Sequence, residues 1–168
     1  MGRWTAKNLL LKGHKVWILD NLSNGSEKNI KEFRGKLQGF IIGDVKDKSL
    51  LSKLFENNFE ICIHFAAAID VQDSIDNPEN NFNDNCVGTF NVLEQCRKHN
   101  TKIVFISSAL VYKTALSGKK ITEEHPLNAS CPYSANKISG ENLVMSYFKT
   151  YNLPAVILRP FSIYGPYQ

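Results

Sequence analysis

The sequence lacks the features that mark membrane, secreted and disulfide-built proteins. No apolar run approaches the ~18 residues needed to span a bilayer, so no membrane partner is expected. The apolar run Leu9–Leu11 near the start is short and is followed by a lysine, which argues against a signal peptide. The four cysteines form no CxxC pair, and their scatter indicates reduced thiols in a cytoplasmic protein without a bound metal.

Charge is present but nowhere concentrated. The net charge is +4, and residues 1–60 hold 11 Lys and Arg against 7 Asp and Glu. No basic block is dense enough to indicate a nucleic-acid partner, so a solvated surface is the simpler interpretation. No repeat, low-complexity segment or linker divides the chain. With 168 residues and 43% hydrophobic content, residues 1–168 are expected to form one domain with one core.

Short apolar, β-rich runs recur along the chain. They are largely continuous rather than alternating, which is typical of strands buried on both faces of a parallel sheet. The runs lie at 15–20, 40–43, 60–65, 102–107 and 155–158.

Segments with helical spacing separate these runs. The helices are expected at 4–12, 49–57, 83–99 and 133–151. Gly13 suits the end of the first helix, and Pro132 suits the first turn of the last one. Alternation of strands and helices predicts an α/β fold, a doubly wound parallel sheet built from right-handed crossovers. Unusually for a dinucleotide-binding chain, the alternation opens with a helix, because no strand precedes Gly2.

Acidic and amide side chains follow the first two strands. Asp20, at the carboxyl end of a strand and 18 positions past Gly2, is placed to accept hydrogen bonds from a ribose diol, which favours NAD over NADP. The competing interpretation, of equal weight, is an Asp that caps the loop beginning at Asn21. Asp44 and Val45 follow the next strand and could hold an adenine edge, although such a tripeptide is more often a plain turn.

Small and polar residues follow the third strand and enter the next helix. Phe65, Ala66 and Ala67 would let a ligand approach the backbone, or would serve close helix packing. His64 is more simply a satisfied core histidine than a ligand or base. Gly88 costs ~1 kcal/mol inside a helix, which indicates close approach to another backbone or to a cofactor, with Asn85 then facing the nicotinamide side.

The strongest pattern is a serine at a strand end followed by YxxxK. Tyr133 and Lys137 are four residues apart and therefore share one helix face. A lysine ammonium one turn away favours the phenolate of a tyrosine whose reference pKa is near ~10. Ser108 could orient a substrate alcohol. Together these groups would remove a proton from a carbinol while hydride leaves to NAD.

These motifs together resemble the extended short-chain dehydrogenase/reductase superfamily, in its nucleotide-sugar epimerase/dehydratase branch, over essentially the whole chain. The resemblance implies a partial Rossmann-like NAD-binding domain. It implies that Ser108, Tyr133 and Lys137 are the catalytic triad, and that the substrate contacts are Ser108, Tyr133 and Ser162. It implies that NAD is bound by Gly2, Asp20, Asn21, Asp44, Val45, Phe65, Ala66, Ala67, Asn85, Tyr133, Lys137 and Phe161.

Within the branch, the residues after Ser108 discriminate between reactions. Dehydratases typically carry acidic residues there, and this chain has Ala109 and Leu110. The pattern therefore resembles a UDP-glucose or UDP-N-acetylglucosamine 4-epimerase. Another dehydratase or reductase of the branch, or a non-catalytic module that keeps the fold, are the alternatives. The chain departs from the family pattern at Ser162, where Asn is usual, and at Lys113, where Gly is usual.

The resemblance also implies missing parts. The family's first strand with its GxxGxxG turn, of which Gly2 would be the last glycine, and the carboxyl-terminal substrate domain are not in the sequence. Residues 1–168 alone are therefore expected to bind NAD poorly and to be inactive, with a gap in the sheet between the runs at 15–20 and 60–65. Family members commonly form homodimers through the helices that are expected here at 83–99 and 133–151.

Overall fold

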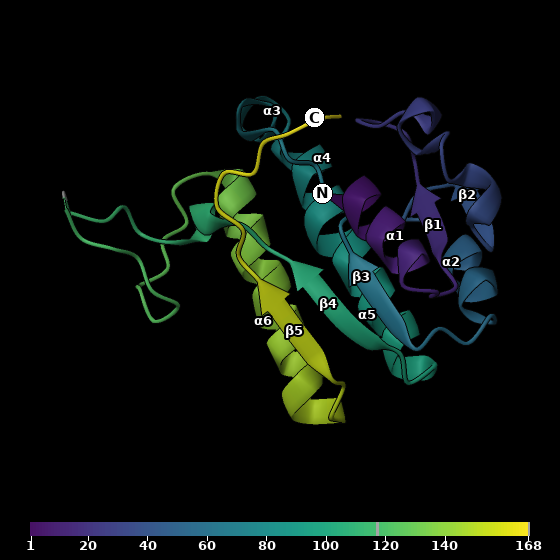
Figure 1. The fold of residues 1–168 in the computed structure, drawn as a ribbon. Helices are drawn as coiled ribbons and strands as arrows, with labels where there is room; N and C mark the ends of the chain where they lie inside the picture. The colour runs from purple at the N-terminus through teal and green to yellow at the C-terminus, as the bar shows by residue number, and fades with distance from the viewer. Residues whose placement is uncertain (117, 168) are drawn as a thin grey trace.

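The computed structural model describes residues 1–116 and 118–167 as strands, helices and connecting loops (Figure 1). The elements in chain order are α1 (Gly2–Leu11), β1 (Trp17–Asp20), η1 (Glu27–Ile30), η2 (Arg34–Lys36), β2 (Gly39–Ile42), α2 (Lys48–Phe55), β3 (Ile61–His64), α3 (Val71–Asp76), α4 (Pro78–Phe82), η3 (Asn83–Val87), α5 (Gly88–Lys98), β4 (Lys102–Ile106), η4 (Ala109–Val111), α6 (Pro132–Tyr151) and β5 (Ala155–Leu158).

The strands form two parallel sheets. β1 pairs with β2, with Trp17 opposite Gly39, and the second sheet has the order β3-β4-β5. In the second sheet His64 lies opposite Phe105, and Ile106 lies opposite Leu158. No ladder joins β1 to β3 within the described part of the chain. The sheet has therefore not closed up, and the gap expected between these two strands is present.

Two apolar clusters on opposite faces of β1 show that the fold is doubly wound. Ile18 packs with the cluster around α1, which contains Ala6 and Phe33. Its neighbour Leu19 packs with the larger cluster that contains Leu93 and Phe105. Successive strand residues point to opposite faces, so α1 lies on one face and α2 and α5 on the other. The larger cluster contains side chains from both sheets, and it holds them in one core despite the gap.

Local sequence explains where the helices begin. The Asp47 side chain accepts from the backbone N–H groups of Ser49 and Leu50 at the start of α2. α6 begins at Pro132, as predicted, with a reciprocal cap between Cys131 and Ser134. It ends at Asn152, whose φ of 54° is left-handed.

Several predicted boundaries differ from the structure by one or two residues, and two of the differences are described here. The first strand begins at Trp17 and not at residue 15, because its ladder with β2 begins at Trp17 opposite Gly39. The helix predicted at 83–99 is a single π-helical turn, η3, followed by α5 from Gly88 to Lys98. Such a turn inserts a residue into the helix and often marks a functional site.

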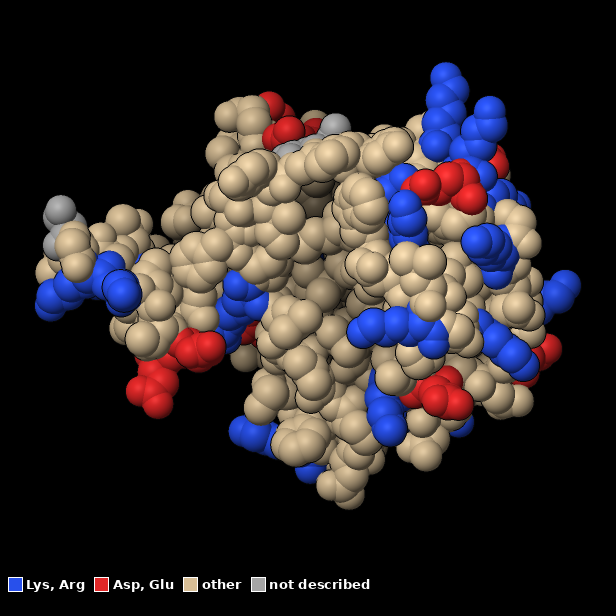
Figure 2. Space-filling model, in the orientation of Figure 1, with Lys and Arg blue, Asp and Glu red and all other residues tan. Residues whose placement is uncertain are grey.

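The face of the β3-β4-β5 sheet opposite α5 and α6 is apolar. In Figure 2 this face is largely uncharged, whereas Lys and Arg gather over the N-terminal elements. Val156 and Leu158 on β5 are 53% and 47% exposed. No helix among the described residues is long and apolar enough to cross a membrane.

Candidate active site

The predicted site residues gather where the parallel strands end. The five strands of the described residues run parallel within their sheets, so Asp20, His64 and Ile106 stand at carboxyl ends. This edge of an open α/β sheet is where ligands bind. The loops after β1, β3 and β4 and the first turn of α6 meet there.

Ser108 is held by the turn that follows β4. Its side chain caps the short helix η4 by accepting from the Leu110 N–H at 3.2 Å. The Ser107 N–H donates to the Leu158 carbonyl at 2.8 Å, and the Ala109 N–H donates to the Pro160 carbonyl at 3.0 Å. These two bonds fix Ser108 between neighbours that are tied to the end of β5.

Tyr133 and Lys137 lie on the first turns of α6, next to the turn that carries Ser108. The two side chains are buried, with only 6% and 5% of each residue exposed. Burial raises the pKa of Tyr133, and the hydrogen bond with Ser108 lowers it in part. The prediction that Lys137 makes this phenol acidic was wrong for this structure, because the Lys137 ammonium donates instead to the Ile106 carbonyl at 2.8 Å. Burial lowers the pKa of Lys137 to about 8, against the opposing charge of Glu141.

His64 is a satisfied core histidine, as predicted. Its Nε2 lies 3.0 Å from the Thr89 hydroxyl, and its ring packs near Phe105. Burial, with a smaller contribution from the Lys137 charge, lowers the pKa of His64 to about 3. The ring therefore stays neutral next to the site.

Asp20 and Asp44 stand at the ends of β1 and β2. The Asp20 carboxylate accepts from the Leu22 N–H at 2.8 Å, so the capping interpretation is confirmed, while the residue stays exposed to a ligand. Asn21 donates to Asp44 at 3.1 Å. Burial raises the pKa of Asp44, but the Lys46 N–H, the Asn21 amide and the Lys46 charge outweigh it and lower the pKa overall. Asp44 is thus a fixed carboxylate beside Asp20's loop.

The loop after β3 is held from two sides. A Cβ on Gly2 would lie 3.8 Å from the Phe65 ring, so two predicted cofactor residues from distant parts of the chain are neighbours. Ala66 is exposed and Ala67 half-buried. The Asn85 amide accepts from the Ala68 N–H at 3.0 Å and donates to the Ala68 carbonyl at 2.9 Å. Because the second N–H of Asn85 donates to Asn81, both amide donors are used inside the chain, and the residue serves to shape this loop.

Gly88 makes a close approach, as predicted, but to a side chain. A Cβ at this position would lie 2.6 Å from Val45 Cγ2. The tightest contact within the chain is therefore with a side chain rather than with another backbone. It presses the predicted adenine residue Val45 against the start of α5.

The two predicted residues after β5 lie in different surroundings. The exposed Phe161 ring stacks on Tyr112, with 6.3 Å between centroids. Ser162 is exposed, and no hydrogen bond joins it to another residue among those the structure describes. Its substrate contact remains a prediction.

Sequence reasoning missed four polar residues beside the site. Asn136 donates to Asn81 at 2.9 Å, which ties the catalytic helix α6 to α4. Glu141 and Arg159 form a largely buried ion pair with a 2.6 Å contact. The spacing of Glu141, one helical turn after Lys137, was the available signal.

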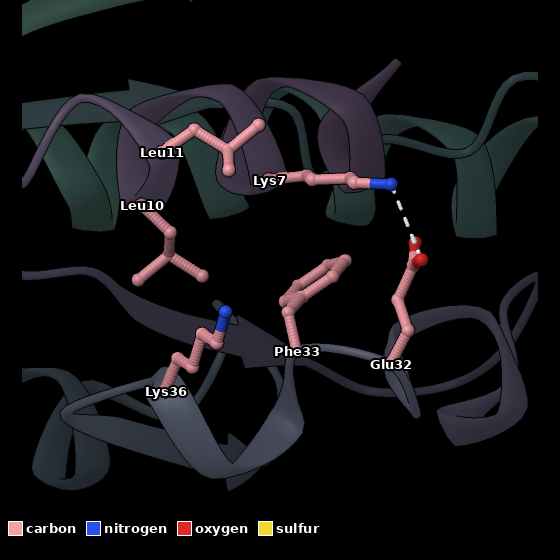
Figure 3. A pocket seen from close by; sticks show the side chains of 6 residues that line it. All are labelled: Lys7, Leu10, Leu11, Glu32, Phe33 and Lys36. Carbon is pink, nitrogen blue, oxygen red and sulfur yellow. Dashed lines mark hydrogen bonds and ion pairs between the residues drawn. The ribbon is translucent and has the colours of Figure 1, made fainter.

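A separate surface pocket lies away from this site (Figure 3). It is formed between α1 and the segment around η1 and η2, and Lys7 and Glu32 form an ion pair of 3.2 Å at its edge. It contains none of the predicted site residues, so it takes no part in the chemistry at the strand ends. Its lining residues are Lys7, Leu10, Leu11, Glu32, Phe33 and Lys36.

The fold and these residues define an NAD-binding α/β protein of Rossmann-like architecture. The model of the NAD dependent epimerase/dehydratase family matches residues 1–168. The chain belongs to that family, whose cofactor is NAD.

The known relatives include proteins named as epimerases and proteins named as dehydratases. The chain is 35% identical over 169 residues to a putative UDP-glucose 4-epimerase of Methanocaldococcus jannaschii, covering 100% of this chain and 54% of the relative. It is 34% identical over 156 residues to a dTDP-glucose 4,6-dehydratase of Mycobacterium tuberculosis, and this match covers 91% of this chain and 46% of the relative. The chain thus spans about half the length of the curated relatives it matches.

Solved structures agree with the fold. Pal from Bacillus thuringiensis is 48% identical with a TM-score of 0.97, covering 99% of this chain and 54% of that one. A UDP-glucose 4-epimerase from Thermus thermophilus in complex with NAD is 30% identical with a TM-score of 0.88. This match covers 94% of this chain and 50% of the epimerase chain.

Proposed function

We propose that the protein epimerises a nucleotide-diphosphate sugar, such as a UDP-sugar, at C4 through a transient 4-keto sugar, with NAD as a bound prosthetic group. The observation that carries this proposal is the convergence of Ser108, Tyr133 and Lys137 at the carboxyl end of β4. A buried phenol, a serine hydroxyl and an ammonium group within one turn of each other suit proton exchange with a sugar alcohol. The names of several relatives support the choice of substrate.

Three residues of the chain have separate roles in the proposed reaction. Tyr133 takes the proton of the C4 hydroxyl and returns it to the same oxygen after the 4-keto sugar has turned over, so that the returning hydride reaches the other face of C4. Ser108, whose hydroxyl lowers the pKa of Tyr133, orients the sugar hydroxyl. Lys137 lies one turn away on α6, where its ammonium donates to the Ile106 carbonyl at 2.8 Å.

NAD would be held by the residues at the other strand ends. It supplies the acceptor that takes up and returns the hydride. The exposed carboxylate of Asp20 has the acceptor chemistry that a ribose diol requires, and Asp44 is fixed as a carboxylate nearby. Lys137 would donate to the nicotinamide ribose, and Phe161 would line the nicotinamide side.

The turn after Ser108 favours epimerisation over dehydration. Dehydration must expel the C6 hydroxyl as water, which requires an acid or base beside the sugar. Here η4 presents Ala109 and an exposed Leu110, 49% accessible. Neither side chain can transfer a proton.

The test is an assay of the full-length protein with UDP-galactose and UDP-N-acetylglucosamine, followed by mass spectrometry and NMR of the products. Epimerisation gives a product of unchanged mass with inverted C4 and no build-up of reduced cofactor. A product lighter by one water would establish the dehydratase alternative instead. A protein that binds the sugars without turnover would be a non-catalytic module.

We further propose a cytoplasmic homodimer formed by α5 and α6. These helices carry exposed apolar side chains, including Phe90, Met145 and Phe148, which are 41%, 42% and 47% exposed. A groove between η3 and α6 adjoins them, lined by Phe82, Cys86, Ser139, Asn142 and Leu143. Sedimentation of Phe148→Glu as a monomer, against a dimeric wild type, is the expected result.

A further inference from the structure

A buried carboxylate sits behind the candidate catalytic groups. Glu141 is 3% exposed and lies on α6 one turn after Lys137. Its Oε1 accepts from the Ser107 hydroxyl at 2.5 Å and from Arg159 Nε at 2.9 Å. Its Oε2 accepts from Arg159 Nη2 at 2.6 Å. Both oxygens are therefore used, and the two-point contact with the guanidinium fixes their orientation.

Arg159 extends this cluster to the loops on the far side of the sheet. Its Nη1 donates to the Tyr112 hydroxyl at 3.0 Å and to the Glu123 carbonyl at 3.3 Å. Tyr112 in turn stacks on Phe161. One ion pair thus connects α6, the end of β4 and the end of β5, which are the three elements that carry Ser108, Tyr133 and Phe161.

The groups that surround Lys137 leave Glu141 as its counter-charge. From β3, His64 is neutral, because burial holds its pKa at about 3. From η3, burial raises the pKa of the Cys86 thiol, so it is also uncharged. From β4 come the Phe105 ring, 5.2 Å from the ammonium, and the Ile106 carbonyl. Among the described residues, Glu141 is the carboxylate whose charge favours the ammonium form of Lys137.

We propose that Glu141, held by Arg159, is a positioning residue that fixes α6 against the ends of β4 and β5 and keeps Lys137 protonated. The role of Glu141 in turnover rests on the proposed function. Its test does not, because the test measures the titration of Lys137 and not the reaction. The pair itself is a property of residues 107, 137, 141 and 159. A carboxylate without Arg159 would be an unpaired buried charge, which is costly.

The experiment is an NMR titration of the Lys137 Cε–Hε signals in the full-length protein with ¹³C-labelled lysine. The signals are assigned by their loss in Lys137→Met. In Glu141→Gln the midpoint of Lys137 is expected to fall by at least about 0.5 pH unit, because a neighbouring negative charge is removed. In Glu141→Asp, which keeps the charge and shortens the reach, the midpoint should remain near that of the wild type.

Glu94→Gln is the matched control. Glu94 also forms a two-point pair with an arginine, at 3.0 Å for each bond to Arg97, and accepts from a tyrosine hydroxyl, but it does not act on Lys137. Its variant should leave the Lys137 midpoint unchanged. A folded Glu141→Gln protein with an unchanged midpoint would overturn the proposal.

The two hypotheses fail in different ways. If wild type turns over no nucleotide sugar but Glu141→Gln shifts the titration, the reaction is wrong and the positioning pair stands. If turnover is found, its alkaline limb should move to lower pH in Glu141→Gln and not in Glu94→Gln. Should Glu141→Gln fail to fold, the double variant Glu141→Gln/Arg159→Met removes both charges of the pair. The Lys137 midpoint is then expected to fall by a smaller amount than the single variant predicts. No fall in the double variant would contradict the proposal.

Discussion

The Lys137 ammonium donates to the carbonyl oxygen of Ile106 at 2.8 Å. Ser108, rather than Lys137, is the group that lowers the pKa of Tyr133. The two groups differ in their partners for a physical reason. The Ile106 carbonyl at the end of β4 is a buried acceptor for the Lys137 ammonium, whereas the Ser108 hydroxyl faces the Tyr133 phenol. Lys137 is therefore a buried cation supported by the backbone and by Glu141, and its cost in stability can be measured.

Replacing Lys137 with Met should stabilise the protein at neutral pH while abolishing turnover. The pKa of Lys137 is lowered to about 8 in the folded state, so the unfolded chain binds more protons between pH 8 and the usual value near ~10.4. Below this window the folded state carries the full cost of the buried ammonium, at most about 3 kcal/mol. Loss of the bond to Ile106 offsets part of it, which leaves a gain of about 1 kcal/mol.

Urea unfolding at pH 7 and pH 10 checks this sign. The free energy of unfolding of the wild type, relative to that of Lys137→Met, should rise between pH 8 and pH 10. The stability advantage of the variant is therefore smaller at pH 10 than at pH 7. A variant that is less stable than wild type at pH 7 would show that the ammonium is fully compensated in the fold.

Replacing Asn85 with Asp should destabilise the loop after β3. Asn85 is 2% exposed and donates to the Ala68 carbonyl and to Asn81. An aspartate has no N–H to donate and places a charge among acceptors, so a loss of about 3 kcal/mol in the free energy of unfolding is expected. Asn80→Asp, at an exposed position of α4, should change stability by about 0.5 kcal/mol or less. Equal effects of the two substitutions would mean that the Asn85 amide bonds carry no stability.

Replacing Gly88 with Ala should weaken NAD binding through Val45. The new Cβ would lie 2.6 Å from Val45 Cγ2, so the valine must move, at a cost of about 1–3 kcal/mol. In the double variant Gly88→Ala/Val45→Ala the clash is absent, and NAD affinity should recover relative to Gly88→Ala. A calorimetric titration with NAD, carried out on the full-length protein, measures both variants. No recovery in the double variant would show that the effect does not pass through Val45.

The strands, the main helices and the grouping of Ser108, Tyr133 and Lys137 could be predicted from the sequence because these follow from local patterns. Apolar runs, Pro132 and the spacing of Tyr133 and Lys137 are all visible within a few residues. The partner of Lys137 was not predictable, since the Ile106 carbonyl is a backbone group brought in by sheet packing. Glu141 and Arg159 lie 18 residues apart, and their contact depends on how α6 packs on β5. The buried contacts of Asn85 and Asn136 with Asn81, beside the π-helical turn at Asn83–Val87, are likewise not revealed by any periodicity.

Turnover by Tyr133→Phe in the full-length protein, with NAD affinity measured in parallel, tests the central claim most directly. If the phenol exchanges the proton of the sugar hydroxyl, kcat should fall by about 10²–10⁴-fold, while NAD binding and the thermal unfolding midpoint stay close to those of the wild type. Undiminished kcat in a folded variant that binds NAD would contradict the role of Tyr133 and, with it, the proposed reaction at this site.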